Sequence, residues 1–598
     1  MGAVTDLRMD WRALTGLRRT VKAIGDLDPE SYQLIPDDLE ASVDKHGANV
    51  AFRFEGTLMT YDEFESIANR VAHWALAQGF EAGDVVALFM ENRPEYVATW
   101  FGLSKVGIVT ALINNNLSDE ALAHCVNIAD AKAVISGADQ DDAMASTIDL
   151  FKDDPALWTW GGTETNRVRA LEPVLAEQSP ERPDRSHRDG IKAAELALYV
   201  YTSGTTGLPK AARLTHTRTQ GMSRTFIGPC RITQRDRVYI TLPLYHGTGG
   251  ICGVGIALNT GASIILRRKF SASQFWDDAA DEGATSFAYI GELCRYLLNQ
   301  PPHPKEQAHR LRTGFGNGLR PEIWEDFFKR FNIPHLAEFY GSTEGNVSFV
   351  NVDGKVGAVG RIPPFLKSRF EHIKFVKFDI ETEEPVRAPN GLCIECEDDE
   401  PGEAIGLIGD DVRQRFEGYN DAEATKKKIL RDVFEPGDMW FRTGDLMRKD
   451  AKGWVYFIDR IGDTFRWKGE NVATNEVGEV LSQFSGIEHA NVYGVPVPGT
   501  DGKAGMAAIT APGDIDWDAL HGFLAERLPA YARPLFLRVQ PEAETTGTFK
   551  YRKVDLVKEG FNPGAVPDPV YFAHPELGRF VPMTQEHYDT ILAGGFKF

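Results

Sequence analysis

The sequence predicts an α/β protein with a large, multi-lobed N-terminal domain of mainly parallel sheets, a β-rich subdomain and a small α+β C-terminal domain. From Thr60 onward, helical patterns such as "YDEFESIANRVAHWALAQG" alternate with short apolar runs such as "VVALFM", which is typical of a parallel sheet covered by helices. Strand-rich sequence follows Phe349, and a compact mixed segment begins near Arg460. The 598 residues are too many for one ordinary core, so we expect more than one domain.

The N-terminal residues carry a basic amphipathic pattern over 9–24. Its apolar side chains recur at helical spacing: Trp11, Leu14, Leu17, Val21 and Ile24. Arginine and lysine occupy other positions of the segment, so the helix lies either on an anionic membrane surface or on the body of the protein. We expect it to pack on the body.

The middle of the chain contains an exposed connection and one long apolar stretch. The polar, proline-containing residues 177–189 predict the connection, which precedes the strand "ELALYVY". The stretch "GGICGVGIALNTGASIIL", residues 249–266, is interrupted by Asn259, Thr260 and Ser263. A membrane span needs about 20 continuous apolar residues, so we expect a buried helix followed by a strand.

Changes in sequence character divide the chain into four regions. Residues 1–40 form an N-terminal extension with the amphipathic helix, and residues 41–459 form the large domain. Residues 460–561 form the C-terminal domain. Residues 562–598 contain prolines and aromatic side chains, and we expect this extension to fold back onto the body.

Composition excludes several classes of protein. The formal net charge of -21 argues against nucleic acid as the main partner, so an anionic ligand must be held by a local site. Six scattered cysteines fit a reducing, intracellular setting better than a disulfide scaffold. Cys393 and Cys396 lie in "GLCIECE", which predicts a strand with the two thiols on opposite faces. The N-terminus lacks the continuous apolar run of a secretory signal.

The segment "YTSGTTGLPK" gathers hydrogen-bond donors directly after an apolar run. Its hydroxyls, glycines and lysine are Thr202, Ser203, Gly204, Thr205, Thr206, Gly207 and Lys210. Glycine lets successive N–H groups turn toward an anion, and the hydroxyls and the lysine add donors. Because Pro209 precedes Lys210, the pattern is not a Walker A loop. It favours a site for the β- and γ-phosphates of a nucleotide over an ordinary polar turn.

This segment resembles the phosphate-loop signature of the adenylate-forming superfamily, which includes acyl-CoA synthetases, peptide-synthetase adenylation domains and firefly-type luciferases. "YIGELCRYLLNQP" from Tyr289 and "EFYGSTEGN" from Glu338 resemble in particular the very-long-chain acyl-CoA synthetase and fatty acid transport protein branch. The resemblance runs in order from about Tyr61 to the C-terminus. It implies that ATP converts a carboxylate to an acyl-adenylate with loss of pyrophosphate. A thiol then displaces AMP after rotation of a mobile C-terminal domain.

The resemblance assigns catalytic roles to single positions. Tyr340 packs against adenine, Thr343 contacts the α-phosphate and Glu344 holds Mg2+, a hard cation that suits a carboxylate oxygen beside phosphates. Lys550 in "TTGTFKYRK" contacts the α-phosphate and the acyl carboxylate. Thr343, Glu344 and Lys550 are therefore the expected catalytic residues, whereas the nearby Arg552 and Lys553 are expected to be surface charges.

Other positions complete the expected ATP site by resemblance. Tyr201 begins the phosphate loop, and Gly316 and Asn317 in "FGNG" border the purine. Asp445 in "FRTGDL" accepts hydrogen bonds from both ribose hydroxyls, a task that suits two adjacent carboxylate oxygens, and Arg460 joins it.

The acyl and CoA positions depart in part from the pattern of the superfamily. His246 and Gly250 in "YHGTGG" are expected to border the acyl site, although His246 could equally be a packed core histidine. Some long-chain synthetases have a gating tryptophan here, where this chain has Gly249 and Gly250. Gly469 in "RWKGENV" is expected to admit the pantetheine arm of CoA. Gly462 stands where many relatives have a charged hinge residue.

We therefore expect an ATP-dependent, AMP-forming acid–thiol ligase that converts long-chain or very-long-chain fatty acids to their CoA esters, with Mg2+ as cofactor. Two alternatives stay open: a fatty acyl-AMP ligase that loads a carrier protein, and a transport protein that couples fatty acid uptake to acyl-CoA formation. We expect a cytoplasmic protein with ATP, fatty acid and CoA as partners and no nucleic acid. Peripheral contact with the inner membrane face, a homodimer and the preferred chain length are left open by the sequence.

Overall fold

The computed structural model describes residues 2–25, 27–202, 208–380, 382–468, 470–498, 500, 502–543 and 553–596. The chain forms two compact units, each with segments distant in sequence. The first unit contains Met1–Leu319, Ile323–Pro363 and Ile408–Ile429, and the second contains Arg320–Glu322, Pro364–Leu407 and Leu430–Phe598.

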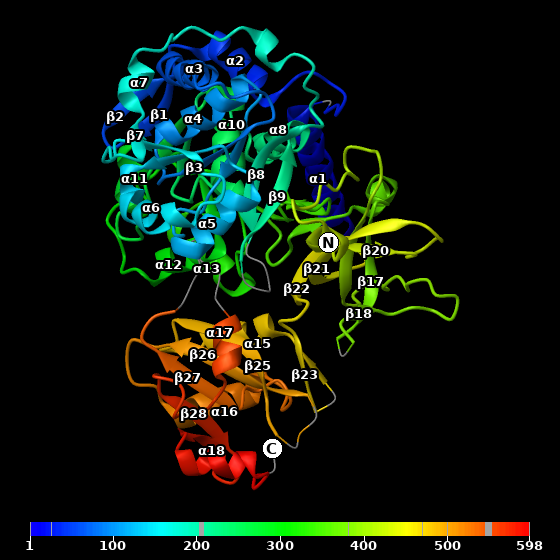
Figure 1. Ribbon diagram of the computed structural model, residues 1–598. Coiled ribbons are helices and arrows are strands. Elements are labelled where there is room, and N and C mark those ends of the chain that lie inside the picture. Colours follow the sequence, from blue (N-terminus) through cyan, green and yellow to red (C-terminus); the bar gives the residue numbers. More distant parts are fainter. Residues whose placement is uncertain are drawn as a thin grey trace. The chain divides into compact units, whose positions relative to one another are not determined.

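Two mainly parallel sheets form the framework of the first unit (Figure 1). The strands of one sheet are β3 (Val85–Phe89), β4 (Val109–Leu112), β5 (Ala133–Gly137), β6 (Ala156–Trp160), β7 (Val168–Ala170), β8 (Leu196–Thr202) and β9 (Lys210–Thr215). Those of the other are β1 (Val50–Phe54), β2 (Thr57–Thr60), β10 (Arg237–Ile240), β11 (Ser263–Leu266), β12 (Ser286–Ile290), β13 (Thr313–Asn317), β14 (Leu336–Gly341) and β15 (Ser348–Asn351). The short strand β16 (Gly360–Arg361) follows them in sequence.

The strand order confirms the predicted parallel architecture. The sheets run β7-β6-β5-β3-β4-β8-β9 and β15-β14-β13-β12-β10-β11-β1-β2. Edge strands pair antiparallel, as β8 does with β9 and β14 with β15, whereas the central pairs are parallel. All five residues of β3 are buried, as expected for an apolar strand covered on both faces.

Helices connect and cover these strands. They are α1 (Gly2–Ile24), α2 (Ile35–His46), α3 (Tyr61–Ala77), α4 (Pro94–Lys105), α5 (Asp119–Ile128), α6 (Asp141–Thr147), α7 (Glu172–Ala176), α8 (His216–Arg224), α9 (Ile227–Cys230), α10 (Val254–Thr260), α11 (Phe275–Asp281), α12 (Gly291–Asn299), α13 (Pro321–Phe331) and α14 (Ala422–Lys426). The start of α3 shows why the predicted helix forms there. The Thr60 hydroxyl accepts from the N–H of Glu63, and the Glu63 carboxylate accepts from the N–H of Thr60, which is a capping box.

The terminal helix α1 packs against α8 and α9, so the expected packing on the body is confirmed. Thr20 is buried against Gly228 of α9, and Gly16 lies against Val352, which directly follows β15. The apolar side chains of Trp11, Leu14 and Val21 are instead exposed. The amphipathic pattern predicted the helix correctly but not the face that packs, because small residues allow the closest approach of two helices.

The stretch 249–266 forms a buried helix followed by a strand, as predicted. It lies in a π-helix, η4 (Gly247–Gly253), which continues into α10 and then β11. In the part of the chain that the structure describes, no helix has both the length and the apolarity to cross a membrane.

The second unit contains an antiparallel sheet and a mixed sheet. The first has the order β22-β21-β19-β17-β18, with β20 beside β21. Its strands are β17 (Ile373–Asp379), β18 (Glu384–Pro385), β19 (Gly402–Leu407), β20 (Ile429–Arg431), β21 (Met439–Lys449) and β22 (Trp454–Arg460). The remaining elements are β23 (Phe465–Trp467), β24 (Glu470–Val472), α15 (Thr474–Ser482), β25 (His489–Pro496), β26 (Lys503–Thr510), α16 (Trp517–Arg527), β27 (Phe536–Gln540), α17 (Val554–Glu559), β28 (Val570–His574), β29 (Arg579–Pro582) and α18 (Gln585–Leu592).

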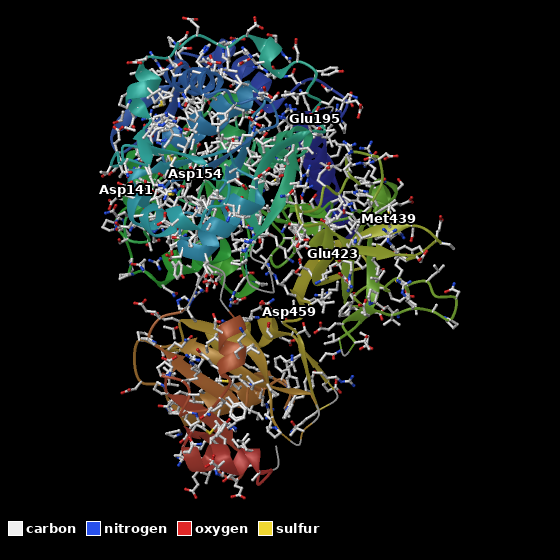
Figure 2. All side chains as sticks on the ribbon, in the orientation of Figure 1. Asp141, Asp154, Glu195, Glu423, Met439 and Asp459 are labelled. Atoms are coloured by element: carbon white, nitrogen blue, oxygen red, sulfur yellow. The ribbon has the colours of Figure 1, made fainter. Side chains whose placement is uncertain are left out.

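The C-terminal residues join the mixed sheet. The strands run β25-β26-β27-β28-β29, and Phe572 of β28 is the register partner of Phe536 of β27. Both rings belong to one apolar core with residues from β25 and β26. Asp459, labelled in Figure 2, lies near the end of β22, where its buried carboxylate accepts from the N–H and the hydroxyl of Thr474. The four predicted region boundaries stay predictions.

The strand predicted for "GLCIECE" is wrong. Cys393 and Glu395 make isolated bridges to two different segments, at Arg387 and Val376. The N–H groups of Cys393 and Cys396 likewise donate to different partners, the carbonyl oxygens of Val433 and Phe375. The apolar side chains therefore alternate, but the segment does not pair continuously with one neighbouring strand. Both cysteines are free thiols.

Candidate active site

The two ends of the predicted phosphate loop face each other across a hairpin. Thr202 is the last residue of β8, Lys210 is the first of β9, and the two are register partners. The Tyr201 hydroxyl donates to the Cys125 carbonyl oxygen at 2.7 Å, which anchors β8 on α5. Ser203, Gly204, Thr205, Thr206 and Gly207 lie outside the described residues, so their phosphate contacts stay predictions.

Arg218 fixes the loop that follows β14. Its Nε donates to the Thr343 carbonyl oxygen at 2.7 Å, and its Nη2 donates to those of Ser342 at 2.9 Å and Gly345 at 2.5 Å. The rigid fork of a guanidinium can hold several carbonyl oxygens of one loop at once. Tyr340 precedes this loop on β14, with its ring centre 6.1 Å from that of Phe349.

Tyr419 links Glu344 to the phosphate hairpin, which is the pair of strands β8 and β9 that the predicted phosphate loop connects. The Glu344 carboxylate is buried, and its Oε1 accepts from the Tyr419 hydroxyl at 2.6 Å. The Thr202 side chain also hydrogen-bonds the phenol, and Lys210 Nζ lies 5.8 Å from the centre of the Tyr419 ring. Burial raises the pKa of Tyr419 above its ordinary value, so the phenol stays protonated and donates. Three predicted residues are thus brought together around one tyrosine.

The segment containing Tyr419 is tied to β9 by its backbone. Tyr419 forms a bridge with Ala212, the Arg213 N–H donates to the Gly418 carbonyl oxygen, and the Asn420 N–H donates to that of Ala211. These bonds begin one residue after Lys210. Tyr419 is therefore positioned by β9, the strand that begins with Lys210.

The surroundings of Glu344 fit a hard divalent cation. Within the described residues, Glu344 makes no ion pair, and no three His, Cys, Asp or Glu side chains form a metal-binding group. Mg2+ is commonly held by one or two carboxylates together with substrate phosphates and water, rather than by a complete protein cage. One buried carboxylate beside a phosphate hairpin is therefore a suitable ligand set.

The expected ribose pair lies together in the second unit. Asp445 and Arg460 are register partners on β21 and β22, with Arg460 Nε 3.8 Å from Asp445 Oδ1. The part of β21 just before Asp445 is held by Glu403, which is fully buried and accepts from the Gly444 N–H at 3.1 Å. The guanidinium of Arg442 compensates the Glu403 charge at 3.0 Å.

The glycines expected at the acyl and purine sites are required by close packing. A Cβ at Gly250 would overlap the Leu244 carbonyl oxygen, and one at Gly249 would lie 2.6 Å from that of Pro243. This backbone therefore does not accept a gating tryptophan at either position. His246 precedes the π-helix and is half-buried, and π-helical turns are frequent at functional sites. A Cβ at Gly316, one residue before Asn317, would overlap the Tyr289 carbonyl oxygen.

Gly469, Lys550 and Arg552 lie outside the described residues, so their expected roles stay predictions. The prediction that Lys553 is a surface charge is wrong. Its Nζ donates to Asp463 Oδ2 and Thr474 Oγ1, each at 2.9 Å. The buried carboxylate of Asp459 adds negative charge beside this group, and the positive charge of Lys553 opposes the rise in the pKa of Asp459 that burial causes.

Sequence reasoning missed Arg218 and Tyr419. Arg218 contacts a loop 125 residues further along the chain, and Tyr419 contacts a residue 75 positions before it. Neither lies in a local pattern that predicts such a role, and both are recognised only by their tertiary contacts.

Family models identify the two parts of the chain. The AMP-binding enzyme model matches residues 39–394, and the AMP-binding enzyme C-terminal domain model matches residues 476–550. The chain belongs to the AMP-binding enzyme family. The resemblance inferred from "YTSGTTGLPK" is therefore confirmed.

The relatives of this AMP-binding enzyme confirm the predicted branch. Long-chain fatty acid transport protein 6 of Mus musculus is 42% identical over 549 residues, which cover 91% of this chain and 88% of the relative. Long-chain fatty acid transport protein 1 of Homo sapiens is 42% identical over 573 residues, which cover 94% of this chain and 88% of the relative.

Solved structures of other proteins confirm the predicted fold class. The anthranilate CoA ligase AuaEII, crystallised with anthranoyl-AMP, gives a TM-score of 0.74 at 20% identity and covers 88% of this chain and 96% of its own. A fatty acyl CoA synthetase of Mycobacterium tuberculosis gives 0.62 at 21% identity and covers 89% of this chain and 99% of its own.

Proposed function

We propose that this AMP-binding enzyme is a long-chain fatty acid–CoA ligase. In the first step the fatty acid carboxylate attacks the α-phosphorus of ATP, which gives acyl-AMP and pyrophosphate. In the second step the thiol of CoA attacks the acyl carbon, which gives acyl-CoA and AMP. Family membership and the fatty acid transport protein relatives support this class of reaction. The meeting of Thr202, Lys210 and Glu344 around Tyr419 is the observation that supports the adenylation site.

The phosphate hairpin supplies positive charge and donors where pyrophosphate leaves. Lys210 offsets the charge of the β- and γ-phosphates, and the hydroxyl of Thr202 begins the row of donors. The buried carboxylate of Glu344, which accepts a hydrogen bond from Tyr419, would hold Mg2+. The cation, when bound, neutralises phosphate charge in the developing transition state.

The remaining residues bind and orient the nucleotide and the acyl group. Tyr340, Gly316 and Asn317 border adenine, while Thr343, held through its carbonyl oxygen by Arg218, contacts the α-phosphate. In the second unit, the carboxylate of Asp445 accepts from the ribose hydroxyls beside Arg460. His246 and Gly250 border the acyl chain, and Gly469 admits the pantetheine arm of CoA.

A second candidate is coupled fatty acid uptake. The relatives are named long-chain fatty acid transport proteins, and conversion of an imported acid to its CoA ester traps it inside. We place the protein in the cytoplasm, with α1 as the element that contacts the inner membrane face. The exposed Trp11, Leu14 and Val21 support that contact.

Product analysis tests the proposal. The purified protein is incubated with Mg2+, ATP and fatty acids of increasing length, and either CoA or a pantetheinylated carrier protein is offered as the thiol. We expect acyl-CoA, AMP and pyrophosphate in equal amounts and little acyl-carrier. Preferential loading of the carrier would contradict the ligase proposal. Fatty acid flux into liposomes in the absence of ATP and CoA would contradict coupled uptake.

Lys550→Ala separates the two half-reactions. We expect fatty-acid-dependent ATP–pyrophosphate exchange to fall by about 100-fold or more, because the charge that stabilises the transferring group is lost. Thioester formation from supplied acyl-adenylate should be retained. Lys558→Ala, which removes an exposed lysine of α17, is the matched control. Equal exchange in Lys550→Ala and the parent protein would remove Lys550 from this role.

A further inference from the structure

The two motifs that resemble the fatty acid transport protein branch meet inside the first unit. Tyr289 belongs to β12 and Glu338 to β14, and β13 lies between these strands. Tyr289 is the register partner of Gly316, and Gly316 is the register partner of Glu338. The three residues therefore form one row across the sheet, with their side-chain positions on the same face.

Gly316 leaves space for the outer two side chains to meet. The Tyr289 hydroxyl donates to Glu338 Oε2 at 2.7 Å, so the ring passes over the central strand. A Cβ at Gly316 would lie 2.7 Å from Cδ2 of the Tyr289 ring. Tyr289 and Glu338 are both buried, with 0% and 2% of their surface exposed.

The other carboxylate oxygen holds the turn that follows β13. Glu338 Oε1 accepts from the Leu319 N–H at 3.1 Å, and the N–H of Gly318 is a further donor to the same carboxyl group. Gly318 has a φ of +79°, a conformation that glycine adopts without strain. The turn that directly follows Gly316 and Asn317 is thus fixed by a side chain from the neighbouring strand.

The same side chain lies on the strand that leads to Tyr340. Glu338 is two residues before Tyr340 and six before Glu344, so its carboxyl group connects the turn at 317–319 with the strand and loop at 338–344. Burial raises the pKa of Glu338 to about 8, and the donors of Tyr289, Leu319 and Gly318 oppose that rise. The buried group therefore depends on these donors for its polar contacts.

We propose that the Tyr289–Glu338 pair positions the adenine end of the nucleotide site without touching the nucleotide. It holds the Asn317–Leu319 turn in register with the strand that carries Tyr340, and so sets nucleotide affinity. Tyr289 and Glu338 are positioning residues, and the inference rests on the proposed function in that 316–317 and Tyr340 border the purine.

Three single substitutions test this inference. Tyr289→Phe removes one oxygen atom, and Glu338→Gln keeps the shape of the side chain but replaces an acceptor with a donor. Tyr239→Phe is the matched control, because the buried hydroxyl of Tyr239 donates to Asp278 Oδ2 at 2.8 Å from β10 of the same sheet. AMP affinity is measured by calorimetric titration, and the KM values for ATP and fatty acid are measured by pyrophosphate exchange.

We expect Tyr289→Phe and Glu338→Gln each to weaken AMP binding by about tenfold and to raise the KM for ATP equally, as expected for loss of one hydrogen bond to a carboxyl group. The KM for fatty acid and the kcat at saturating ATP should stay within about twofold, and Tyr239→Phe should leave AMP affinity unchanged. The double variant should lose little more than either single variant, because both remove the same contact.

Unchanged AMP affinity in Tyr289→Phe and Glu338→Gln would overturn the inference, even if both variants melt at lower temperature. Weaker AMP binding in both variants, in a parent protein that shows no fatty-acid-dependent exchange, would support the positioning role and contradict the proposed ligase function. Since Tyr289→Phe creates almost no cavity, it keeps the test decisive if Glu338→Gln fails to fold.

Discussion

Two buried glutamates six residues apart, Glu338 and Glu344, each accept a hydrogen bond from a tyrosine, and the two pairs differ in what surrounds the carboxyl group. Tyr289 donates to Glu338 at 2.7 Å within the sheet, and Tyr419 donates to Glu344 at 2.6 Å in the loop that follows. Both carboxyl oxygens of Glu338 accept hydrogen bonds from buried groups, namely the Tyr289 hydroxyl and the Leu319 N–H. Oε1 of Glu344 accepts from Tyr419, while the neighbouring Arg218 donates to backbone carbonyl oxygens.

The carboxyl group of Glu338 is thus suited to support the structure, and that of Glu344 is suited to bind a ligand. A carboxyl group whose oxygens are both engaged by tyrosine and backbone donors fixes local geometry and has little capacity for a ligand. A buried carboxylate with one tyrosine donor keeps a free lone-pair direction for a cation. Under the proposed function, the same pair of residue types would position the adenine side of the site in one case and supply a metal ligand in the other.

Glu344→Gln should give the largest effect. We expect kcat for pyrophosphate exchange to fall by about 100-fold or more, because the charge that holds the cation is lost. Glu338→Gln is the natural control and should keep most of its kcat. Equal losses of kcat in the two variants would remove the distinction between the pairs.

Tyr419→Phe should give an intermediate effect. Loss of the hydrogen bond to Glu344 should lower kcat by about tenfold, since a bond to a charged group contributes about 1.5 kcal/mol. The corresponding change in the other pair, Tyr289→Phe, should act on the KM for ATP instead. A Tyr419→Phe enzyme with parental kcat and a raised KM would show that both pairs serve only to bind the nucleotide.

The third prediction concerns how the free energy of unfolding depends on pH. The pKa of Glu338 is about 8 in the folded protein, above the ordinary value of about 4.3 in an unfolded chain. The folded state therefore holds an extra proton between these values, and its stabilising contribution is lost as pH rises through that window. The facing groups Tyr289 and Cys294 stay protonated in this range, because burial raises the pKa of both.

Glu338→Gln removes this titration. The free energy of unfolding is measured with urea for the parent and for Glu338→Gln. We expect the difference, parent minus variant, to decrease from pH 5 to pH 8. Parallel pH profiles for the two proteins would show that Glu338 does not titrate in this window.

Local patterns predicted much of the fold and the ends of the phosphate site. The alternation after Thr60 predicted both parallel sheets, and "YTSGTTGLPK" predicted that Thr202 and Lys210 lie at the two ends of one loop. The same alternation failed in "GLCIECE", where successive residues bond to different segments. Amphipathic spacing likewise did not predict that α1 packs through Gly16 and Thr20.

The contacts that assemble the site could not be predicted from local sequence. Arg218 and Tyr419 act on residues distant in the chain, and in the local sequence "EGYND" nothing distinguishes Tyr419 from any other tyrosine. The need for glycine at 250 depends on the Leu244 carbonyl oxygen, which approaches only after the π-helix has formed. Such constraints are properties of tertiary structure.

Fatty-acid-dependent ATP–pyrophosphate exchange tests most directly the claim that Thr202, Lys210 and Glu344 meet to form an adenylation site. We predict exchange that requires both Mg2+ and a long-chain fatty acid in the parent protein and is lost in Glu344→Gln but not in Glu338→Gln. Absence of exchange with every chain length, or exchange of equal rate without fatty acid, would contradict the claim.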